Sequence, residues 1–497
     1  MLIWFLPVFL VFLMIGLPVF FGLLAAPGIL LWLNGQERDI TLLYRNVYNG
    51  MDSFPLMAIP FFMLAGELMN KGGITERLVE FSQALMGHLR GGLAHVNILS
   101  SMLFAGLSGS AVADTSALGS MLIPAMEKQG YTRRFAAAVT AASSVIGPII
   151  PPSGIMIIYA YVMGESVAAL FLAGIVPGVM VGVGLMLVVR LMANRYDLPK
   201  AERIVNKGQV LTAREHWVSF ILLRLNLGWL IFAIFRGSTG FASGDDTSTM
   251  VVLATYLVGV LAAHVLLMSL RRKIDPDFRT VTKRAVVPLQ TPILILGGIL
   301  LGVFTPTEAA AVAVFYAIVV AFFVLKTMKL SDLPDVLSRS AMTSAVVLLL
   351  VGAAMAFKTV VSLSYAPQIL ADYILSLSEN PLILLFLINI LLFIVGMFLD
   401  AGPAIIILGP ILGPIFVEMG VHPVHFAIIM SVNLTVGLAT PPMGLVLFVA
   451  SSVAKERVET IAKAILPFLA VEIFVIFLIT YVPAISMTIP RLTGFVQ

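Results

Sequence analysis

The sequence contains no cysteine and few charged residues, and both absences limit its chemistry. Without Cys, the 497-residue chain has neither disulfide bonds nor thiolate metal ligands. Only 11% of its residues are charged, against about 25% in soluble globular proteins. The six His residues show no metal-ligand spacing, and no HExxH pair occurs. These absences argue against a Cys-dependent or zinc-dependent hydrolase, and a net charge of +4 gives no sign of nucleic-acid binding.

The sequence is instead rich in long runs of apolar residues. Hydrophobic residues make up 60% of the chain, and runs of about 20 apolar residues, enough for a helix to cross a bilayer, recur along it. The sequence therefore predicts an all-α polytopic membrane protein with about eleven full spans. The first run, from Ile3 to Leu33, is too long for the core of a signal peptide, and we interpret it as the first span.

Two segments share an unusual pattern of glycine and proline inside apolar runs, VIGPIIPPSGIMI at 145–157 and TVGLATPPMGLVLF at 435–448. At a constant offset of 290 residues, the two halves of the chain have nine identical positions on one diagonal. These are Gly106 and Gly396, Leu118 and Leu408, Gly119 and Gly409, Pro124 and Pro414, Gly130 and Gly420, Gly147 and Gly437, Pro151 and Pro441, Pro152 and Pro442, and Gly154 and Gly444. The correspondence indicates two structurally equivalent halves, and paired Gly/Pro-interrupted segments are typical of a transporter's binding region.

The charges of equivalent loops indicate that the two halves are inverted. The linker 127–134 carries Lys128, Arg133 and Arg134, whereas its counterpart 417–424 carries no Lys or Arg. Because cytoplasmic loops are rich in Lys and Arg, the first linker is predicted to be cytoplasmic and the second external. The other loops agree and predict a cytoplasmic N-terminus and an external C-terminus: they are basic at 190–209, 271–284 and 455–463, and acidic at 34–53 and 237–249.

Each broken helix follows a stretch that small and polar residues interrupt, at 97–126 in the first half and 388–415 in the second. Since both flanks of each stretch are predicted on one side of the membrane, each stretch is expected to form a re-entrant helical hairpin. Such a tip is tolerated only where protein or water surrounds it. The predicted fold is an inverted repeat with two re-entrant helical hairpins and two broken helices.

The prolines of the broken helices leave backbone carbonyls without a helical partner. Because proline has no N–H, Pro151 frees the carbonyl of Gly147, and Pro441 frees that of Gly437. The hydroxyls of Ser153 and Thr440 are close in sequence, and a site of oxygen ligands with few fixed charges favours Na⁺ over a transition metal. A simple kink is the alternative for either Pro-Pro pair taken alone. The duplicated pairs, with hairpins beside them, favour ion sites.

Two acidic residues inside the predicted hairpins, Asp114 and Asp400, are further candidates, because an ionisable group within a membrane segment is costly and marks function. A helix-capping or interfacial carboxylate is the alternative for each. Glu308 is instead expected to cap a helix, since Thr305 and Glu308 fit a capping box with Pro306 at the first helical position.

At these motifs the sequence resembles the large membrane subunit (M, or DctM-like) of tripartite ATP-independent periplasmic (TRAP) transporters. The resemblance covers residues 1–200 and 286–492. The stretches that carry it include HLRGGLAHVNILSSMLFAGLSGSAVADTSALGSMLIPAM, AASSVIGPIIPPSGIMIIYA, GMFLDAGPAIIILGPIL and NLTVGLATPPMGLVLFVA. It implies an elevator-type fold of the ion-transporter superfamily, in which a transport domain moves against a scaffold.

The resemblance also implies a function, partners and sites. The chain is expected to import an organic acid, coupled to two or more Na⁺ ions, across a bacterial inner membrane. Its expected partners are a small membrane subunit (Q, or DctQ-like) and a periplasmic substrate-binding protein (P). Carried over by motif, the first Na⁺ site comprises Ser108, Ser110, Gly147, Ile150 and Pro151, and the second comprises Gly396, Gly437, Thr440 and Met443. Asp114, Ser153 and Asp400 are expected along the substrate path.

The expected organisation alternates scaffold and transport segments. The transport domain comprises 93–165 and 381–452. The scaffold comprises 1–92 with a cytoplasmic amphipathic helix, 166–208 with a cytoplasmic linker, 286–380 with an arm helix, and 453–497. Residues 209–285 are an inserted two-span segment that the usual M subunit lacks. Within it, Arg224 is expected either to reach the interface or to pair with another subunit.

An alternative function is a secondary anion carrier of the same superfamily that takes its substrate directly from solution. A gene for a periplasmic binding protein beside this one would favour the TRAP transporter. A channel would not need two symmetric ion sites on a moving domain, and steady conductance under voltage would distinguish it.

Overall fold

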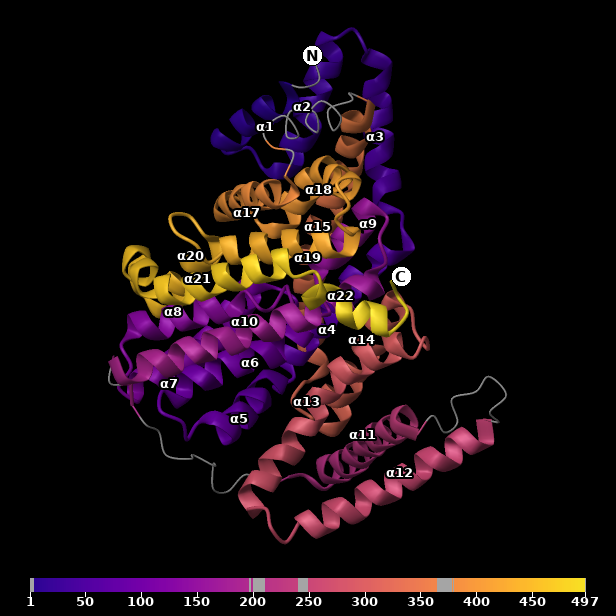
Figure 1. The fold of residues 1–497 in the computed structure, drawn as a ribbon, viewed down its shortest axis with the longest axis vertical. Helices are drawn as coiled ribbons and strands as arrows, with labels where there is room; N and C mark the ends of the chain where they lie inside the picture. The colour runs from indigo at the N-terminus through magenta and orange to yellow at the C-terminus, as the bar shows by residue number, and fades with distance from the viewer. Residues whose placement is uncertain are drawn as a thin grey trace.

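The computed structural model describes residues 4–195, 198–199, 211–239, 249–363, 378 and 380–496, and the regular elements among them are helices (Figure 1). The first half contains α1 (Phe5–Met14), α2 (Val19–Leu33), α3 (Glu37–Met51), α4 (Ala58–Lys71), α5 (Ile74–Met86), α6 (Gly92–Ser108), α7 (Ala111–Lys128), α8 (Arg133–Ser144), α9 (Gly154–Met163) and α10 (Val167–Arg195). The insertion contains α11 (Ala213–Thr239) and α12 (Thr249–Leu270). The second half contains α13 (Pro276–Leu300), α14 (Pro306–Ile318), α15 (Leu333–Leu363), α17 (Pro381–Phe398), α18 (Ala401–Glu418), α19 (Pro423–Gly437), α20 (Leu445–Ala454), α21 (Val458–Tyr481) and α22 (Ala484–Leu492). Most of the expected linkers at 190–209 and 237–249, and part of the expected arm helix, lie outside the described residues.

The hairpins and broken helices recur at the offset found in the sequence. The helices α7 and α18 cover equivalent 18-residue ranges, 290 residues apart. The helices α8 and α19 begin at the equivalent positions Arg133 and Pro423. Each broken helix unwinds around its Pro-Pro pair, between α8 and α9 and between α19 and α20. The predicted pair of broken helices is confirmed.

Helix α21 shows that the halves are inverted. The linker between α7 and α8 lines a pocket with Glu459 and Thr460 at the start of α21. The equivalent linker between α18 and α19 leads to His425, whose imidazole lies 2.7 Å from the Ser486 hydroxyl and 3.2 Å from the carbonyl oxygen of Thr480, in the last turn of α21. The 24 residues of α21 span about 36 Å at about 1.5 Å per residue. Equivalent linkers therefore lie at opposite ends of this helix, as an inverted repeat requires.

Each hairpin enters and leaves on one side. In the first, the N–H of Gly91 before α6 donates to the carbonyl of Pro199 at 3.1 Å, and Gly130 after α7 lines a pocket with the same Pro199. In the second, the Tyr481 hydroxyl at the end of α21 donates to the carbonyl of Leu382, in the first turn of α17, at 3.0 Å. The linker that follows α18 lies at this same end of α21. The two ends of each hairpin therefore lie on one side, as a re-entrant hairpin requires, and the predicted hairpins are confirmed.

The described helices can be divided into two groups, which also contact each other where α5 packs against α6 and α15 against α18. In the first, which we call the repeat body (α6–α10 and α17–α22), the halves interlock, because α7 packs against α20 and α18 packs against α9. In the second, which we call the scaffold group (α2–α5 and α13–α15), α3 and α4 pack against α15, and α4 also packs against α14. The segments 166–208 and 453–497 were expected in the scaffold. Their helices α10 and α21 instead contact α6, α8 and α19, so by packing they belong with the repeat body.

The first apolar run does not form the single span expected. Its two helices, α1 and α2, pack against each other across a turn. Gly16 in this turn has a φ of +86°, and Pro18 directly precedes α2. Glycine adopts this left-handed conformation without a steric penalty, and proline cannot continue the preceding helix. The length of the run predicted a span, but these two residues fold it into a helical hairpin.

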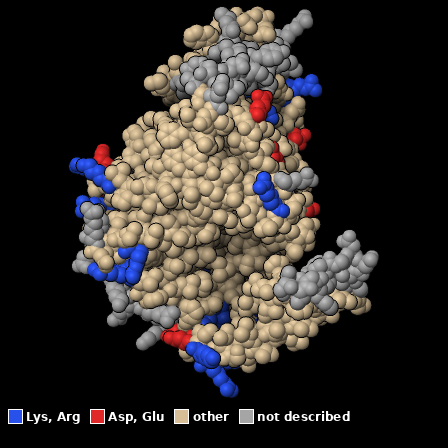
Figure 2. Space-filling view, in the orientation of Figure 1, with Lys and Arg blue, Asp and Glu red and all other residues tan. Residues whose placement is uncertain are grey.

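Nine helices in the described part of the chain are long and apolar enough to cross a membrane, and ten if the bent pair 43–51 and 54–71 counts as one span. The nine include both arms of the second hairpin, α17 and α18, but not the broken helices, whose halves are 10–15 residues long. The all-α polytopic class is confirmed, while the number of full spans stays a prediction. Most charged side chains on the face in Figure 2 lie toward its margins, with a broad uncharged area between them.

Candidate functional site

The first-half site lies where the hairpin tip meets the unwound segment of the broken helix. At the tip, Gly109 has a φ of +60°, and a Cβ built on it would lie 2.8 Å from the carbonyl oxygen of Pro152. From the first turn of α7, the carboxylate of Asp114 reaches the same segment, because a Cβ on Gly147 would lie 2.4 Å from Oδ2 of Asp114. The close approaches require glycine at both positions, and they bring the tip, the start of α7 and the unwound segment together.

The environment of Asp114 fits a small cation. Its side chain is 0% exposed. Its Oδ1 accepts a hydrogen bond from the Ser108 hydroxyl, whereas Oδ2 has no hydrogen-bond partner among the described residues. No backbone N–H in the described chain donates to the carbonyl of Gly147 either, as the proline at position 151 predicts. A buried carboxylate without a partner is costly, and a cation held by these oxygens would remove that cost. Within the described residues, no group of three or more His, Cys, Asp or Glu gathers for a metal.

Two other expected site residues in this half act as helix caps. The Ser110 hydroxyl accepts the backbone N–H three residues on, at 3.4 Å, and caps α7. The Ser153 hydroxyl caps α9 in the same way and donates to the carbonyl of Pro148 at 2.5 Å. This is the carbonyl that Pro152 leaves without its helical partner. Ser153, expected on the substrate path, therefore closes the broken turn.

Ile150 and Pro151 lie in the unwound segment but face other helices. A Cβ on Gly178 of α10 would lie 2.3 Å from Cγ1 of Ile150, so this side chain packs against α10. The carbonyl oxygen of Pro151 lies 3.7 Å from the position of a Cβ on Gly106, in α6. The structure thus brings Ser108, Gly147 and Asp114 together. Ile150 and Pro151 lie nearby, but Ile150 packs against α10 and the Pro151 carbonyl lies near α6.

The second-half site is a backbone-to-backbone contact. A Cβ built on Gly437 would lie 2.6 Å from the Cα of Gly396, at the end of α17. The carbonyl of Gly437, expected to be free, accepts the N–H of Thr440 at 2.9 Å. The Thr440 hydroxyl donates to the carbonyl of Val436 at 2.9 Å. The Met443 side chain is 54% exposed. Gly396, Gly437 and Thr440 are therefore close together, but the carbonyl of Gly437 already has one protein donor.

Asp114 and Asp400 are not equivalent, although both lie in hairpins. At the offset of 290 residues, Asp400 corresponds to Ser110, and both residues are N-caps. The side chain of Asp400 accepts the N–H of Ala401 at 2.7 Å and is exposed. The capping interpretation therefore describes Asp400, whereas Asp114 lies one turn inside its helix and is buried.

The tip of the first hairpin faces the scaffold group. Ile59, Phe62 and Met63 of α4 line a cavity of about 20 Å³ with Ser108 and other residues of the tip. A cavity of this size holds about one water molecule. The contact therefore leaves no room for an organic acid between the tip and α4 in this conformation.

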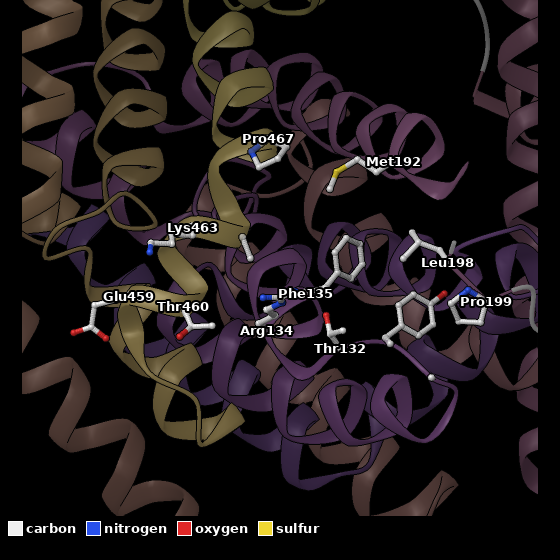
Figure 3. A pocket seen from close by; sticks show the side chains of 13 residues that line it. Thr132, Arg134, Phe135, Met192, Leu198, Pro199, Glu459, Thr460, Lys463 and Pro467 are labelled. Atoms are coloured by element: carbon white, nitrogen blue, oxygen red, sulfur yellow. The ribbon is translucent and has the colours of Figure 1, made fainter. Parts of the chain in front are cut away.

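A larger pocket, of about 520 Å³, lies beside the linker between α7 and α8 (Figure 3). The side chains of Thr132, Arg134 and Phe135 line it opposite those of Thr460 and Lys463 from α21. Burial raises the pKa of the neighbouring Tyr131 phenol to about 12, so this group stays neutral. The 18 residues of α7, about 27 Å of helix at about 1.5 Å per residue, separate this pocket from the tip. It is not part of the predicted ion sites.

The sequence analysis missed two ionisable residues that the structure singles out. Lys358, in the scaffold helix α15, donates to the carbonyl of Val162 near the end of α9 and so joins the two groups of helices. Glu472, in α21, is 0% exposed, and neither carboxylate oxygen has a partner among the described residues. The sequence did contain a signal for both residues, because each is a single charged residue inside an apolar run. The expected capping box of Thr305 and Glu308 is confirmed.

The fold is an inverted repeat with paired broken helices, an architecture typical of secondary transporters. The family described as "Tripartite ATP-independent periplasmic transporter, DctM component" matches residues 6–274 and 239–485. The chain belongs to this family, and the resemblance seen in the sequence is confirmed. Its relatives are named as permeases, which confirms that it is not an enzyme.

Several relatives match the chain nearly end to end. The uncharacterized protein YgiK of Salmonella typhimurium is 38% identical over 97% of this chain and 96% of that protein. The sialic acid TRAP transporter large permease protein SiaM of Vibrio cholerae is 35% identical over 96% of this chain and 95% of that protein. Among solved structures, the YdaH transporter of Alcanivorax borkumensis, described as having an unusual topology, covers 92% of this chain and 89% of its own, with a TM-score of 0.57 and 16% identity. This last likeness shows a shared fold.

Proposed function

We propose that the protein is the large membrane subunit of a Na⁺-coupled importer of a small organic acid, a carboxylate or a sulfonate. The observation that carries the proposal is the buried Asp114 carboxylate, which accepts a hydrogen bond from Ser108 and lies against Gly147, whose carbonyl accepts no hydrogen bond from the described residues. The name of the relative SiaM, a permease for sialic acid, supports an organic acid as substrate. The tripartite organisation that gives the family its name supports a small membrane subunit and a periplasmic binding protein as partners.

The first Na⁺ is held by Asp114, Ser108 and Gly147, and the second by oxygens around Gly396, Gly437 and Thr440. A cation beside Asp114 compensates a charge that burial otherwise makes costly. The first site is therefore the one that depends most on the ion. The chain's own residues position the ion at the hairpin tip, so ion binding fixes the tip against the unwound segment.

The direct test is uptake by the reconstituted complex. The chain, its small subunit and its cognate binding protein are placed in proteoliposomes, after the ligand of the binding protein has been identified. We expect uptake only with an inward Na⁺ gradient and with the binding protein present. Uptake that is equally fast without the binding protein would favour the alternative, a carrier that takes its substrate directly from solution.

The repeat body is proposed to move against the scaffold group as an elevator. Support comes from the cavity of about 20 Å³ at the tip, which cannot admit substrate until the tip leaves α4. Because the chain has no Cys, this motion can be tested with introduced pairs. Met63→Cys with Leu107→Cys places one thiol on each group at this cavity. Cross-linking this pair should stop uptake, and reduction should restore it.

A matched pair inside the repeat body controls for the chemistry. A Cβ on Gly119 would lie 3.4 Å from Cγ1 of Val453, so Gly119→Cys with Val453→Cys joins α7 to α20. Cross-linking this pair should leave uptake largely intact. Continued uptake with the first pair fully cross-linked would contradict the elevator.

The protein is proposed to lie in the bacterial inner membrane, with a cytoplasmic N-terminus and a periplasmic C-terminus. Support comes from the linker 127–134, which is basic, and its counterpart 417–424, which carries Glu418 and no Lys or Arg. The two linkers lie at opposite ends of α21. A thiol at Gln129→Cys should react only from the cytoplasm, and one at Val421→Cys only from the periplasm. The reverse labelling would overturn this orientation.

A further inference from the structure

The inserted helices α11 and α12 enclose a second pocket against α13. The two helices pack on each other, and α11 packs on α13 (Figure 1). Together they surround a pocket of about 200 Å³ near the start of α11, the end of α12 and the start of α13. This pocket lies outside the two repeated halves of the chain, and the proposed transport function does not use it.

The pocket is lined by cations and lacks acids. Arg224, Arg271, Arg279 and Lys283 line it with His216, and no Asp or Glu is among its lining residues. The partners that the structure gives these cations are uncharged. Arg224 lies over the Phe220 ring at 3.2 Å and donates to the ring nitrogen of His264 at 2.9 Å. Arg279 donates to a backbone carbonyl at 3.3 Å, and the Lys283 ammonium lies 3.3 Å from the His216 ring.

Asp275 caps the start of α13, and neither it nor Asp277 lines the pocket. Ion pairs occupy the opposite side of α11 and α13, toward α5. Glu215 of α11 pairs with Arg77 of α5, and Arg284 of α13 pairs with Glu80 of α5 at 3.1 Å. The face toward α5 is thus neutralised by ion pairs. The face toward α12 keeps four positive charges that no described carboxylate approaches within ion-pair distance. Gathering such charges is unfavourable unless an anion joins them.

Most of the remaining lining is apolar, and ion pairs define the position of the pocket along the membrane normal. Leu223, Leu267, Met268, Ile274 and Phe278 form the walls. The ion pairs to α5 set the pocket at the level of α5, which leads directly into α6 at Gly91, beside Pro199. This is the side of the α7–α8 linker, proposed to be cytoplasmic. A ligand here meets cations at the membrane surface and apolar side chains beside them.

We propose that this pocket binds the phosphate headgroup of an anionic phospholipid of the cytoplasmic leaflet. Basic pockets between membrane helices on the cytoplasmic side suit such headgroups. The phosphate lies among Arg224, Arg271, Arg279 and Lys283, and the acyl chains follow the apolar walls along α11 and α12. The lipid thereby joins the inserted helices to α13 and supplies the negative charge that the protein itself lacks here.

The test is native mass spectrometry of the full chain in detergent with added phosphatidylglycerol, phosphatidylcholine or inorganic phosphate. The pocket variant is Arg279→Gln with Lys283→Gln. The control variant is Arg272→Gln with Lys273→Gln, which removes the same charge from the same stretch but from residues that do not line the pocket. A single Arg271→Gln, at the exposed edge, gives a milder change that leaves the packing intact.

We expect the wild-type chain to bind phosphatidylglycerol in preference to phosphatidylcholine. The pocket variant should bind phosphatidylglycerol about 30-fold more weakly, which is about 2 kcal/mol at about 1.4 kcal/mol per tenfold. The Arg271→Gln variant should lose about fivefold, and the control variant should match the wild type. Equal losses in pocket and control variants, or no preference over phosphatidylcholine, would overturn the proposal. Displacement of the lipid by millimolar inorganic phosphate would overturn the lipid as the ligand and assign the pocket to a free anion.

Discussion

Replacing Asp114 by asparagine separates the ion site from the fold, because the change keeps the shape of the side chain and removes its charge. In the wild type, the carboxylate is buried and Oδ2 has no partner among the described residues. Losing a charge-assisted contact to Na⁺ costs about 2 kcal/mol, which weakens Na⁺ binding about 30-fold. A wild-type chain at a Na⁺ concentration 100 times its Kd gains about 2.7 kcal/mol of stability, and the variant at the same concentration would gain only about 0.9 kcal/mol.

The assay is thermal unfolding of the purified chain in NaCl and in choline chloride of equal strength. Without Na⁺, Asp114→Asn should be more stable than the wild type, because burying a neutral amide costs less than burying an unpaired carboxylate. With Na⁺, the order should approach equality or reverse. Asp400→Asn is the matched control, since Asp400 is an exposed N-cap, and it should keep the wild-type response to Na⁺. An undiminished Na⁺ response in Asp114→Asn would refute the assignment of this carboxylate to an ion site.

Three further substitutions follow from the packing. Gly437→Ala would place a methyl group 2.6 Å from the backbone of Gly396, so it should abolish uptake and lower the melting temperature, and a variant with normal uptake would show that this contact is not needed. Ser153→Ala leaves the carbonyl of Pro148 without its donor and removes the cap of α9, so thermal unfolding should show a loss of about 1–3 kcal/mol; an unchanged melting temperature would contradict this. Glu472→Leu removes a buried carboxylate with no described partner, so its stability should equal or exceed that of the wild type, and a clear loss in thermal unfolding would reveal a partner for this group.

Much of the fold could be predicted because glycine and proline residues mark the positions where its helices are interrupted. A proline in a membrane helix removes one backbone hydrogen bond at a defined carbonyl, so Pro151 and Pro441 located both broken helices. The offset of 290 residues between those breaks then located the hairpins, since α7 and α18 follow the same offset. The charge difference between two equivalent linkers predicted the inversion that α21 displays.

Side-chain roles could not be predicted at the same level. Whether a hydroxyl is free or engaged depends on the turn around it, and Ser153 is taken up by the carbonyl of Pro148. The equivalence of Asp114 and Asp400 was inferred from their place in two hairpins, but burial separates them. The assignment of 166–208 and 453–497 to the scaffold was made from their position in the chain, whereas packing depends on which faces of α10 and α21 meet the repeat.

The central claim, that Na⁺ drives uptake through two ion sites, is tested most directly by the substrate gradient at which net transport stops. Proteoliposomes with the complete complex are set at a fixed membrane potential, and the internal substrate concentration that halts net flux is measured at several Na⁺ gradients. Coupling to two Na⁺ ions predicts that a tenfold increase in the Na⁺ gradient raises this balancing substrate gradient about 100-fold, because each tenfold gradient contributes about 1.4 kcal/mol per ion. A balancing gradient that does not change with Na⁺ would contradict the account.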